Sequence, residues 1–495
     1  MTITHTKDLR KITENFSFTL NHGDKAAIIG EEGNGKSTLL KLIYDQGLIT
    51  EYCEYSGEII KSGRFGYLAQ ELTARQRRMT VYEFFCGING FYDLSPAELN
   101  QISRSLGIPN DIFYSDRRVD TMSGGEKVKL QLAGLMICRP DVLLLDEPSN
   151  DLDIAALEWL EHFINSAEVP IIYVSHDETL LENTANVIIH LEQVRRKTLP
   201  VYTVSRSGYR EYIERRDASR SHQEQMARKE QAEFNAQQEK LRKIQSRVEH
   251  EQNAISRSDP HGGRLLKKKM AAVKSMERRF ERECESMTRM PDTEDEIFVR
   301  FRPDITSPKG KTILDLHIDI LQSADRILAR DIDIHINGGE KICITGHNGT
   351  GKTTLLRQIA LQLAARTDIK TAYMPQNYSE CMDYSMTPVE FLSRSGDKDE
   401  ITAIRTYLGS MRYTPDEMNH AISELSGGQK AKLYFIAMNL DGCNVLVLDE
   451  PTRNFSPLSG PVIRRALIEY GGTIISVSHD RKYIEEVCDR VIALN

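Results

Sequence analysis

One large internal duplication constrains the fold of this chain more than any other feature of its sequence. The stretch DKAAIIGEEGNGKSTLLK, which begins at residue 24, returns as EKICITGHNGTGKTTLLR from residue 340. The stretches SGGEKVKLQLAGLMICRPDVLLLDEP and IIYVSHD return as SGGQKAKLYFIAMNLDGCNVLVLDEP and IISVSHD, with the same spacing between them. We therefore predict two homologous domains, at residues 1–206 and 301–495, which flank an unrelated segment at residues 207–300.

Each copy opens with a short apolar strand that leads into the pattern G-x-x-x-x-G-K-[ST] and then into a helical pattern. This context is typical of a phosphate-binding loop, in which glycines let backbone N–H groups and a helix N-terminus converge on an anion. The lysine would bind the β- and γ-phosphates of a nucleotide, and the hydroxyl residue would bind Mg²⁺. The expected phosphate-binding residues are Gly30, Gly33, Asn34, Gly35, Lys36, Ser37 and Thr38, and in the second copy Gly346, Asn348, Gly349, Gly351, Lys352, Thr353 and Thr354.

A second apolar strand in each copy ends in an Asp-Glu pair, and a third ends in a histidine. Parallel sheets bind ligands at the carboxyl ends of their strands, so Asp146 and Asp449 can hold Mg²⁺ there. The next residues, Glu147 and Glu450, are candidate general bases for an attacking water. In isolation such a pair would more simply cap the following helix. The recurrence of the same pattern favours catalysis, with His176 and His479 as further contacts to the γ-phosphate.

Composition excludes several classes of protein. The net charge is −8, and no apolar run approaches the roughly 18 residues of a membrane span. The first residues lack the apolar stretch of a signal peptide, so we expect a cytoplasmic protein. The eight cysteines never form a C-x-x-C pair, which argues against a zinc ribbon or an iron–sulfur cluster and favours reduced thiols.

The sequence of the middle segment, residues 207–300, is polar and predicts helices. Phe234, Leu241, Val248 and Ile255 recur every seven residues, and a second series follows the interruption SDPHGG at Leu266, Val273, Phe280 and Met287. Two interrupted heptad series predict an antiparallel helical hairpin with a short turn. A simple amphipathic helix pair packed on a domain is the alternative.

Cations gather at the predicted turn of this hairpin. Between Ile255 and Arg279 eight Lys and Arg residues face only two carboxylates, although the whole chain is acidic. A charged run is usually a solvated surface. Focused at a hairpin tip, however, it suits contact with the phosphate backbone of RNA, and the lack of aromatic residues there argues against base stacking. The candidate RNA-contacting residues are Arg257, Arg264, Lys267, Lys268, Lys269 and Lys274.

The stretches MSGGEK and LSGGQK resemble the signature loops of ATP-binding cassette ATPases, and the resemblance covers both copies almost from end to end. It implies an α/β fold of two ATP-binding cassette domains, each a P-loop NTPase sheet with a helical subdomain, joined by the helical hairpin. It also implies that each signature faces the other copy's phosphate loop, and that one glutamine in each copy senses Mg²⁺ and the γ-phosphate. The residues concerned are Ser123, Gly124 and Gly125 facing Lys352, Ser426, Gly427 and Gly428 facing Lys36, and the glutamines Gln70 and Gln376.

Two departures from this family pattern stand out. The segments HTKDLRKITEN and QSADRILARD, which precede the phosphate loops, lack the aromatic residue that usually stacks on adenine, so the sequence leaves adenine and guanine undistinguished. The loop after the acidic strand reads SNDLD in the first copy but TRNFSP in the second, which places Ser456 where the first copy has Asp153. We therefore expect two unequal ATP sites.

Paired cassettes, the absence of a membrane segment and a helical linker with a basic tip together resemble the ABC-F family. That resemblance implies a monomeric, Mg²⁺-dependent ATP hydrolase that binds the ribosome at its tRNA exit site. Its linker would extend toward the peptidyl-transferase centre, large-subunit RNA and P-site tRNA. The stretches PTRNFSP and HLEQVRRKTLPVYTVSRSGYREY are similar to the antibiotic-resistance branch, which protects ribosomes against large-subunit drugs. A general translation factor of the same family and, further away, the ATPase subunit of a transporter remain alternatives.

Overall fold

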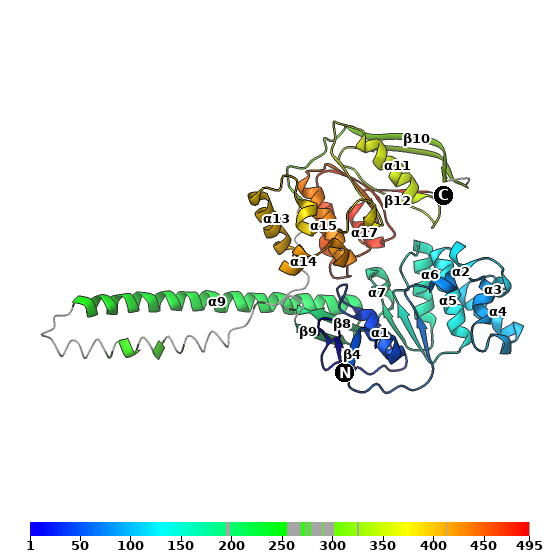
Figure 1. Ribbon diagram of the computed structural model, residues 1–495, viewed down its shortest axis with the longest axis horizontal. Coiled ribbons are helices and arrows are strands. Elements are labelled where there is room, and N and C mark those ends of the chain that lie inside the picture. The colour runs from blue at the N-terminus through cyan, green and yellow to red at the C-terminus, as the bar shows by residue number, and fades with distance from the viewer. Residues whose placement is uncertain are drawn as a thin grey trace. The chain divides into compact units, whose positions relative to one another are not determined.

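The structure is a computed structural model that describes residues 1–194, 199–254, 268, 270–272, 275, 276, 279, 290, 301–323, 326–411 and 413–494. The chain divides into two compact units, of which one combines Met1–Tyr209 with Glu294–Asn495 and the other is Arg210–Thr293. The first unit holds both copies of the duplicated sequence (Figure 1). The boundaries of three separate domains, at residues 206 and 300, stay a prediction.

The first copy is built on a sheet with the strand order β5-β6-β7-β3-β8-β9. Its strands pair in parallel except β8 and β9, which are antiparallel. A smaller antiparallel sheet, β2-β1-β4, belongs to the same copy. The bounds are β1 Thr2–His5, β2 Lys11–Thr13, β3 Lys25–Ile29, β4 Cys53–Ser56, β5 Phe65–Leu68, β6 Val142–Asp146, β7 Ile171–Val174, β8 Val187–Gln193 and β9 Leu199–Ser205.

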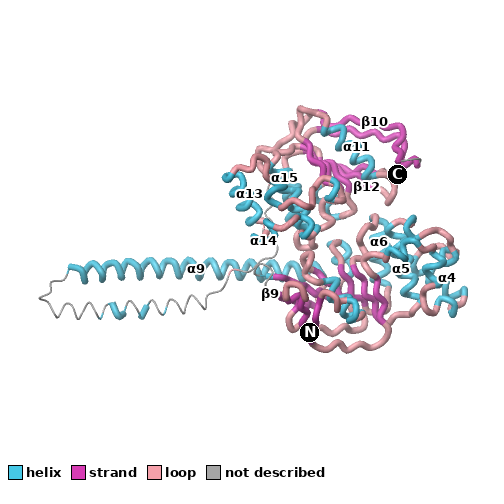
Figure 2. The backbone as a smooth tube through the Cα atoms, viewed as in Figure 1, coloured by secondary structure: helices cyan, strands magenta, loops and turns pink. Residues whose placement is uncertain are grey.

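The second copy repeats this topology in the order β13-β14-β15-β12-β16, with every neighbouring pair parallel. Figure 2 draws the strands of both copies in magenta. Strand for strand, this order matches β5-β6-β7-β3-β8, so the duplication seen in the sequence is also a duplication of the fold. A long antiparallel hairpin, β10-β11, accompanies the sheet. The bounds are β10 Thr312–Ser323, β11 Arg326–Asn337, β12 Lys341–Thr345, β13 Thr371–Met374, β14 Val445–Asp449, β15 Thr473–Val477 and β16 Arg490–Ala493.

Helices bury both sheets. Every residue of β3, β6, β14 and β15 is buried, which is typical of parallel strands covered on both faces and explains their unbroken apolar runs. The phosphate-loop helices α1 (Lys36–Tyr44) and α11 (Lys352–Ala364) direct leucines into these cores, including Leu39 and Leu355. The helices that follow the acidic and histidine strands are α6 Ile154–Ser166 and α7 Glu178–Thr184, with α16 Gly460–Glu469 and α17 Arg481–Val487 in the second copy.

A helical subdomain interrupts each copy between its first edge strand and its acidic strand. It ends in the signature helices α5 (Gly124–Ile137) and α15 (Gly427–Leu440). The others are α2 Ala74–Arg78, α3 Val81–Cys86 and α4 Pro96–Leu106, and in the second copy α12 Pro388–Leu392, α13 Lys398–Ser410 and α14 Pro415–Asn419. Short 3-10 helices are η1 Gln46–Leu48, η2 Phe91–Asp93, η3 Ile112–Tyr114, η4 Val119–Thr121, η5 Tyr378–Glu380 and η6 Ile422–Glu424.

The second unit contains the long helix α9, Tyr209–Ala254 (Figure 1). Leu241 and Ala227 are buried and Phe234 between them is half-buried, so a seven-residue seam runs along the helix as the heptads predicted. Lys268 is helical and exposed. The other predicted tip residues lie outside the described residues, namely Arg257, Arg264, Lys267, Lys269 and Lys274. So do the seam positions Ile255, Leu266, Val273, Phe280 and Met287. The side chain of Val248 is not described either.

Candidate nucleotide-binding sites

The two phosphate loops have nearly the same geometry. Lys36 Nζ donates hydrogen bonds to the carbonyl oxygens of Gly30 and Glu31, at 2.8 and 3.0 Å, and Lys352 Nζ donates to Gly346 and His347, both at 2.9 Å. Each lysine therefore reaches back across its own loop, at the place where nucleotide phosphates would bind. The first glycine of each loop has a φ near +150°, and a Cβ at Gly30 would lie 2.2 Å from a backbone oxygen of β8, so only glycine fits.

Each predicted Mg²⁺ position combines a hydroxyl and a carboxylate. Ser37 Oγ donates to Asp146 Oδ1 at 2.8 Å, and Tyr67 donates to the other oxygen of that carboxylate at 3.0 Å. In the second copy Thr353 bonds to Asp449, and Asp449 Oδ2 is buried without a hydrogen-bond partner. A buried carboxylate oxygen that has no hydrogen-bond partner and lies next to a phosphate loop is suited to bind a cation. Within the described part of the chain no group of three or more His, Cys, Asp or Glu side chains could hold a metal by itself.

Other predicted phosphate-loop residues have structural partners. Asn34 is buried, and its Nδ2 donates to the Leu191 carbonyl at 2.9 Å, which ties the loop to β8. Thr38 hydrogen-bonds Tyr52. The nucleotide-binding roles of both residues stay predictions.

The candidate base of the first copy, Glu147, is held by three side chains. His176 Nε2 lies 3.3 Å from Oε1, while Gln70 Nε2 and Asn150 Nδ2 donate to Oε2 at 2.9 and 2.5 Å. Burial acts to raise the pKa of Glu147, but the His176 hydrogen bond and charge, helped by Lys36 and Asn150, outweigh it and bring the pKa to about 2. Glu147 is therefore ionised at neutral pH. Gln70, predicted to contact Mg²⁺, here contacts the base.

The candidate base of the second copy, Glu450, has a different environment. His479 Nε2 is 3.8 Å from its carboxylate, and the closer partners are the backbone N–H of His479 at 3.2 Å and Ser478 Oγ at 3.4 Å. Burial raises the pKa of Glu450 to about 8, and the charge of Asp449 adds to this effect. Burial also lowers the pKa of His479 to about 4, and its Nδ1 is buried without a partner. The two candidate bases are thus chemically unequal.

Both glutamates share one backbone feature. Glu147 and Glu450 have φ values of +50° and +53°, a left-handed conformation that is uncommon for residues other than glycine. The N–H of each donates to the end of the neighbouring strand, at Val174 and Val477. This conformation turns the chain sharply at the carboxyl end of the acidic strand and points the glutamate at the site.

A cavity of about 680 Å³ opens between the second phosphate loop and the first signature loop. We call this region the second composite site, and the region where the first phosphate loop meets the second signature loop the first composite site. The predicted residues that line the cavity are Asn348, Gly349, Gly351, Lys352, Thr353, Thr354, Gln376, Asp449, Glu450 and His479 from one copy, with Gly124 and His176 from the other. The pairing across copies that the family resemblance implies is therefore present in the geometry of this site.

The serines of the signature loops are helix caps. Ser123 and Ser426 are the N-caps of α5 and α15, and each accepts a hydrogen bond from the backbone N–H three residues later. The side chain at that third position reaches back to the cap, which completes a capping box in both copies. The caps fix the helix N-termini, and any contact of Ser123 or Ser426 with nucleotide stays a prediction.

The loop after β6 contacts the second phosphate loop. Asp153 caps α6 through Oδ1, and its Oδ2 lies 3.3 Å from both His347 Nδ1 and the backbone nitrogen of Asn348. Asn348 Nδ2 donates to the Asp151 carbonyl at 2.7 Å. In the second composite site the carboxylate, Asp153, therefore lies on the loop after β6, and the hydrogen-bond donors, His347 and Asn348, lie on the phosphate loop.

The loop after β14 contacts the first phosphate loop with the opposite polarity. Glu31 Oε1 accepts hydrogen bonds from Ser456 and Ser459 of this loop, at 2.6 and 2.5 Å. The neighbouring Glu32 Oε2 accepts a hydrogen bond from the backbone N–H of Gly428, in the signature helix α15, at 2.8 Å. Here the acids lie on the phosphate loop and the hydroxyls lie opposite. Glu31 and Glu32 are not among the residues predicted from the sequence, although the difference between GEEGNGKS and GHNGTGKT is the signal that could have identified them.

Aliphatic side chains stand where an aromatic ring is usual. Ile12 of β2 lies against Gly35 at the end of the first phosphate loop, and Leu328 of β11 lies against Gly351 and lines the 680 Å³ cavity. The apolar side chains that the structure places against these two glycines are therefore aliphatic.

The comparisons with known proteins agree with this geometry. The family model for ABC transporters matches twice, at residues 13–150 and 329–453. The putative ATP-binding protein YdiF of Bacillus subtilis is 29% identical, with 98% of this chain and 78% of YdiF covered. The ribosome protection protein VmlR of the same organism is 29% identical (96% and 83% covered), and ABC transporter F family member 5 of Arabidopsis thaliana is 27% identical (97% and 72%).

A solved structure shares the fold at low identity. The RNase-L inhibitor matches with a TM-score of 0.58 at 19% identity, over 96% of this chain and 84% of that one. In the described residues, no helix is both long and apolar enough to cross a membrane. The predicted fold class, two cassette sheets with helical subdomains and a helical linker, is confirmed. The chain therefore belongs to the ABC transporter family, as a tandem ATP-binding cassette protein of the ABC-F type.

Proposed function

We propose that this protein is a cytoplasmic, ribosome-binding ATPase whose two cassettes close on ATP and separate after hydrolysis. The observation that carries the proposal is the second composite site, where Gly124 of one cassette lines the same cavity as Lys352 of the other. A nucleotide bound there would touch both cassettes, so its binding would favour their closed arrangement. Because both cassettes lie in one chain, a monomer can form both composite sites.

In ATP hydrolysis the lysines of the phosphate loops and the glutamates after the acidic strands have different roles. Lys36 and Lys352 neutralise the β- and γ-phosphates, and each lies where its Nζ can exchange a loop carbonyl for a phosphate oxygen. Glu147 accepts a proton from the attacking water in the first copy, with His176 orienting the carboxylate. In the second copy Glu450 takes this role only after it loses its own proton, since burial raises its pKa to about 8.

The metal positions fit Mg²⁺ by their donor sets. Ser37 with Asp146, and Thr353 with Asp449, supply oxygen ligands, and the glutamines Gln70 and Gln376 are the remaining candidates. A Mg²⁺ ion held by these oxygen atoms would supply positive charge that offsets the negative charge developing on the phosphates.

The ribosomal part of the proposal rests on similarity and on charge. VmlR, a ribosome protection protein, matches 96% of this chain at 29% identity. The linker segment carries the cations of the predicted tip, of which Lys268 is described and exposed. We infer binding at the tRNA exit site, with the tip directed toward large-subunit RNA and P-site tRNA at the peptidyl-transferase centre. Protection against large-subunit antibiotics is the corresponding cellular activity.

One experiment tests the core of this proposal. Replacing both candidate bases (Glu147→Gln with Glu450→Gln) should leave ATP binding intact and slow hydrolysis by roughly 100-fold or more. The double variant should then sediment with ribosomes in the presence of ATP, while the wild type cycles off. Unchanged turnover, or no ATP-dependent gain in sedimentation, would count against the proposal. Growth of a drug-sensitive host in large-subunit antibiotics separates protection from a general role in translation.

A further inference from the structure

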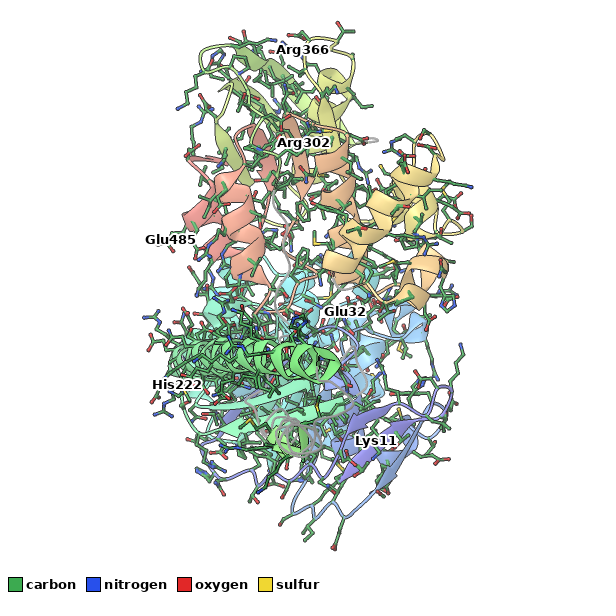
Figure 3. The ribbon with its side chains drawn as sticks, turned by 90° about the vertical axis from the view of Figure 1, so that its left-hand side faces the viewer. Lys11, Glu32, His222, Arg302, Arg366 and Glu485 are labelled. Carbon is green, nitrogen blue, oxygen red and sulfur yellow. The ribbon has the colours of Figure 1, made fainter. Side chains whose placement is uncertain are left out.

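The first phosphate loop carries a carboxylate into the second signature loop. Glu32 belongs to the first phosphate loop (labelled in Figure 3), and its Oε2 accepts the hydrogen bond of the Gly428 backbone N–H at 2.8 Å. The same oxygen lies 3.3 Å from the position that a Cβ on Gly427 would take. The carboxylate therefore sits directly over the two glycines that begin α15.

This position has the chemistry of an anion site. Gly428 is the second residue of α15, so its N–H is one of the donors that an α-helix leaves without an internal partner. The following N–H, of Gln429, is already used by the Ser426 cap. A backbone N–H donor at a helix N-terminus, here bound by a carboxylate oxygen, would also receive a phosphate oxygen.

The second composite site does not repeat this arrangement. The residue that corresponds to Glu32 in the duplicated sequence is Asn348, a neutral amide. Its side chain donates to the Asp151 carbonyl, while Gly124 of the facing signature lines the open cavity beside Lys352. Only the first phosphate loop thus brings a negative charge to the signature that faces it.

We propose that Glu32 is a specificity-determining residue: it competes with the terminal phosphate of ATP for the N-terminus of α15. This inference rests on the proposed function, in which each signature loop receives the terminal phosphate of the nucleotide on the facing loop. ATP must displace the Glu32 carboxylate before the first composite site can close on it. ADP lacks the γ-phosphate and meets no such competition. The first composite site therefore prefers ATP over ADP less strongly than the second.

Glu31 provides a matched control. It carries the same charge one residue earlier, but its carboxylate is bound by Ser456 and Ser459 and not by the signature loop. A general electrostatic effect on a triphosphate would be removed equally by Glu31→Gln and by a change at Glu32. A competition for the α15 N-terminus depends on Glu32 alone.

The test uses the full-length chain with Lys352→Ala, which restricts nucleotide binding to the first phosphate loop. Fluorescent mant-AMP-PNP and mant-ADP are titrated in Mg²⁺ against this chain and against its Glu32→Asn and Glu31→Gln derivatives. We expect Glu32→Asn, which copies Asn348, to tighten mant-AMP-PNP binding about tenfold and to change mant-ADP binding less than twofold. Glu31→Gln should give no such gain.

Three results would overturn the inference. These are equal shifts for both nucleotides in Glu32→Asn, the same gain in Glu31→Gln, or triphosphate binding that stays undetectable with and without Glu32. None of these results bears on the proposed function. That function is tested separately, by whether the Glu147→Gln and Glu450→Gln double variant stays on ribosomes.

Discussion

Arg464 of α16 and Glu178 of α7 form a bidentate ion pair between the two copies of the cassette. Nη1 of Arg464 lies 2.6 Å from Oε1 of Glu178, and Nη2 lies 3.1 Å from Oε2. Only 3% of the arginine side chain and 8% of the glutamate side chain are exposed. Arg464 Nε also donates to Glu486 at 2.7 Å, so most of the guanidinium's donors are satisfied. Burial acts to lower the pKa of Arg464, but its hydrogen bonds to Glu178 and Glu486 raise it overall.

Loss of one partner from this pair should destabilise the protein strongly. Arg464→Ala removes both hydrogen bonds of the guanidinium to the buried Glu178 carboxylate and leaves it with Lys482 Nζ at 3.4 Å, so the change should cost about 3 kcal/mol, the lower end for a broken buried pair. The denaturant midpoint should fall accordingly, and the double variant Arg464→Ala with Glu178→Ala should recover part of the loss. Arg302→Ala, which removes an exposed ion pair with Asp304, is the control and should leave the midpoint unchanged. Equal effects of the two arginine variants would contradict a structural role for the buried pair.

The two candidate bases should have opposite effects on stability. Glu450 has a folded-state pKa of about 8, above its ordinary value, so the folded state loses stability as pH rises from about 4.5 toward 8. Glu147 has a folded-state pKa of about 2, so its contribution is present above about 4.5 and is lost as pH falls toward 2. At pH 7, without nucleotide and in EDTA, Glu450→Gln should raise the melting temperature and Glu147→Gln should lower it, each by at least about 2 °C.

A pH series checks the sign of this effect. The gain from Glu450→Gln over wild type should grow between pH 5 and pH 8 and then level off. A gain that is constant across this range would show that Glu450 titrates normally in the folded protein.

The two composite sites should also contribute unequally to turnover. Asp153 and Ser456 occupy corresponding positions but face different phosphate-loop residues, His347 in one site and Glu31 in the other. Glu147→Gln and Glu450→Gln, made singly, should therefore differ in steady-state ATPase rate and in ATP-dependent ribosome retention. Single variants that cannot be told apart by either measurement would remove the basis for an asymmetric cycle.

The tip cations should set the salt dependence of ribosome binding. Replacing Lys267, Lys268 and Lys269 with alanine should leave the ATPase rate of the free protein unchanged, because the substitutions lie in the linker unit and not in the unit that holds both nucleotide sites. Ribosome affinity should fall, and its logarithmic dependence on salt should flatten by up to about one unit for each lost phosphate contact. Wild-type affinity and slope in the triple variant would show that these lysines are only a solvated surface.

Much of the cassette core could be predicted from the sequence, because each of its motifs is short and continuous. An apolar run that ends in a glycine loop, or in Asp-Glu, already specifies a buried strand and the group at its carboxyl end. The duplicated spacing then placed Lys36, Glu147 and His176 in one copy and Lys352, Glu450 and His479 in the other. The strand order β13-β14-β15-β12-β16 repeats that of the first copy, as homologous sequences require.

The unlike loops SNDLD and TRNFSP already predicted that the two copies differ, but only the tertiary structure decided which contacts and charges result. The Glu32–Gly428 contact joins residues 396 positions apart, and the Arg464–Glu178 contact joins residues 286 positions apart. A short sequence motif does not indicate which residues so far apart in the chain come into contact. The opposite pKa shifts of Glu147 and Glu450 arise in the same way, since both glutamates stand in the same local motif, LDEP. Burial and the partners contributed by distant segments set the charge of a carboxylate, and these are properties of the folded chain that neighbouring residues in the sequence do not fix.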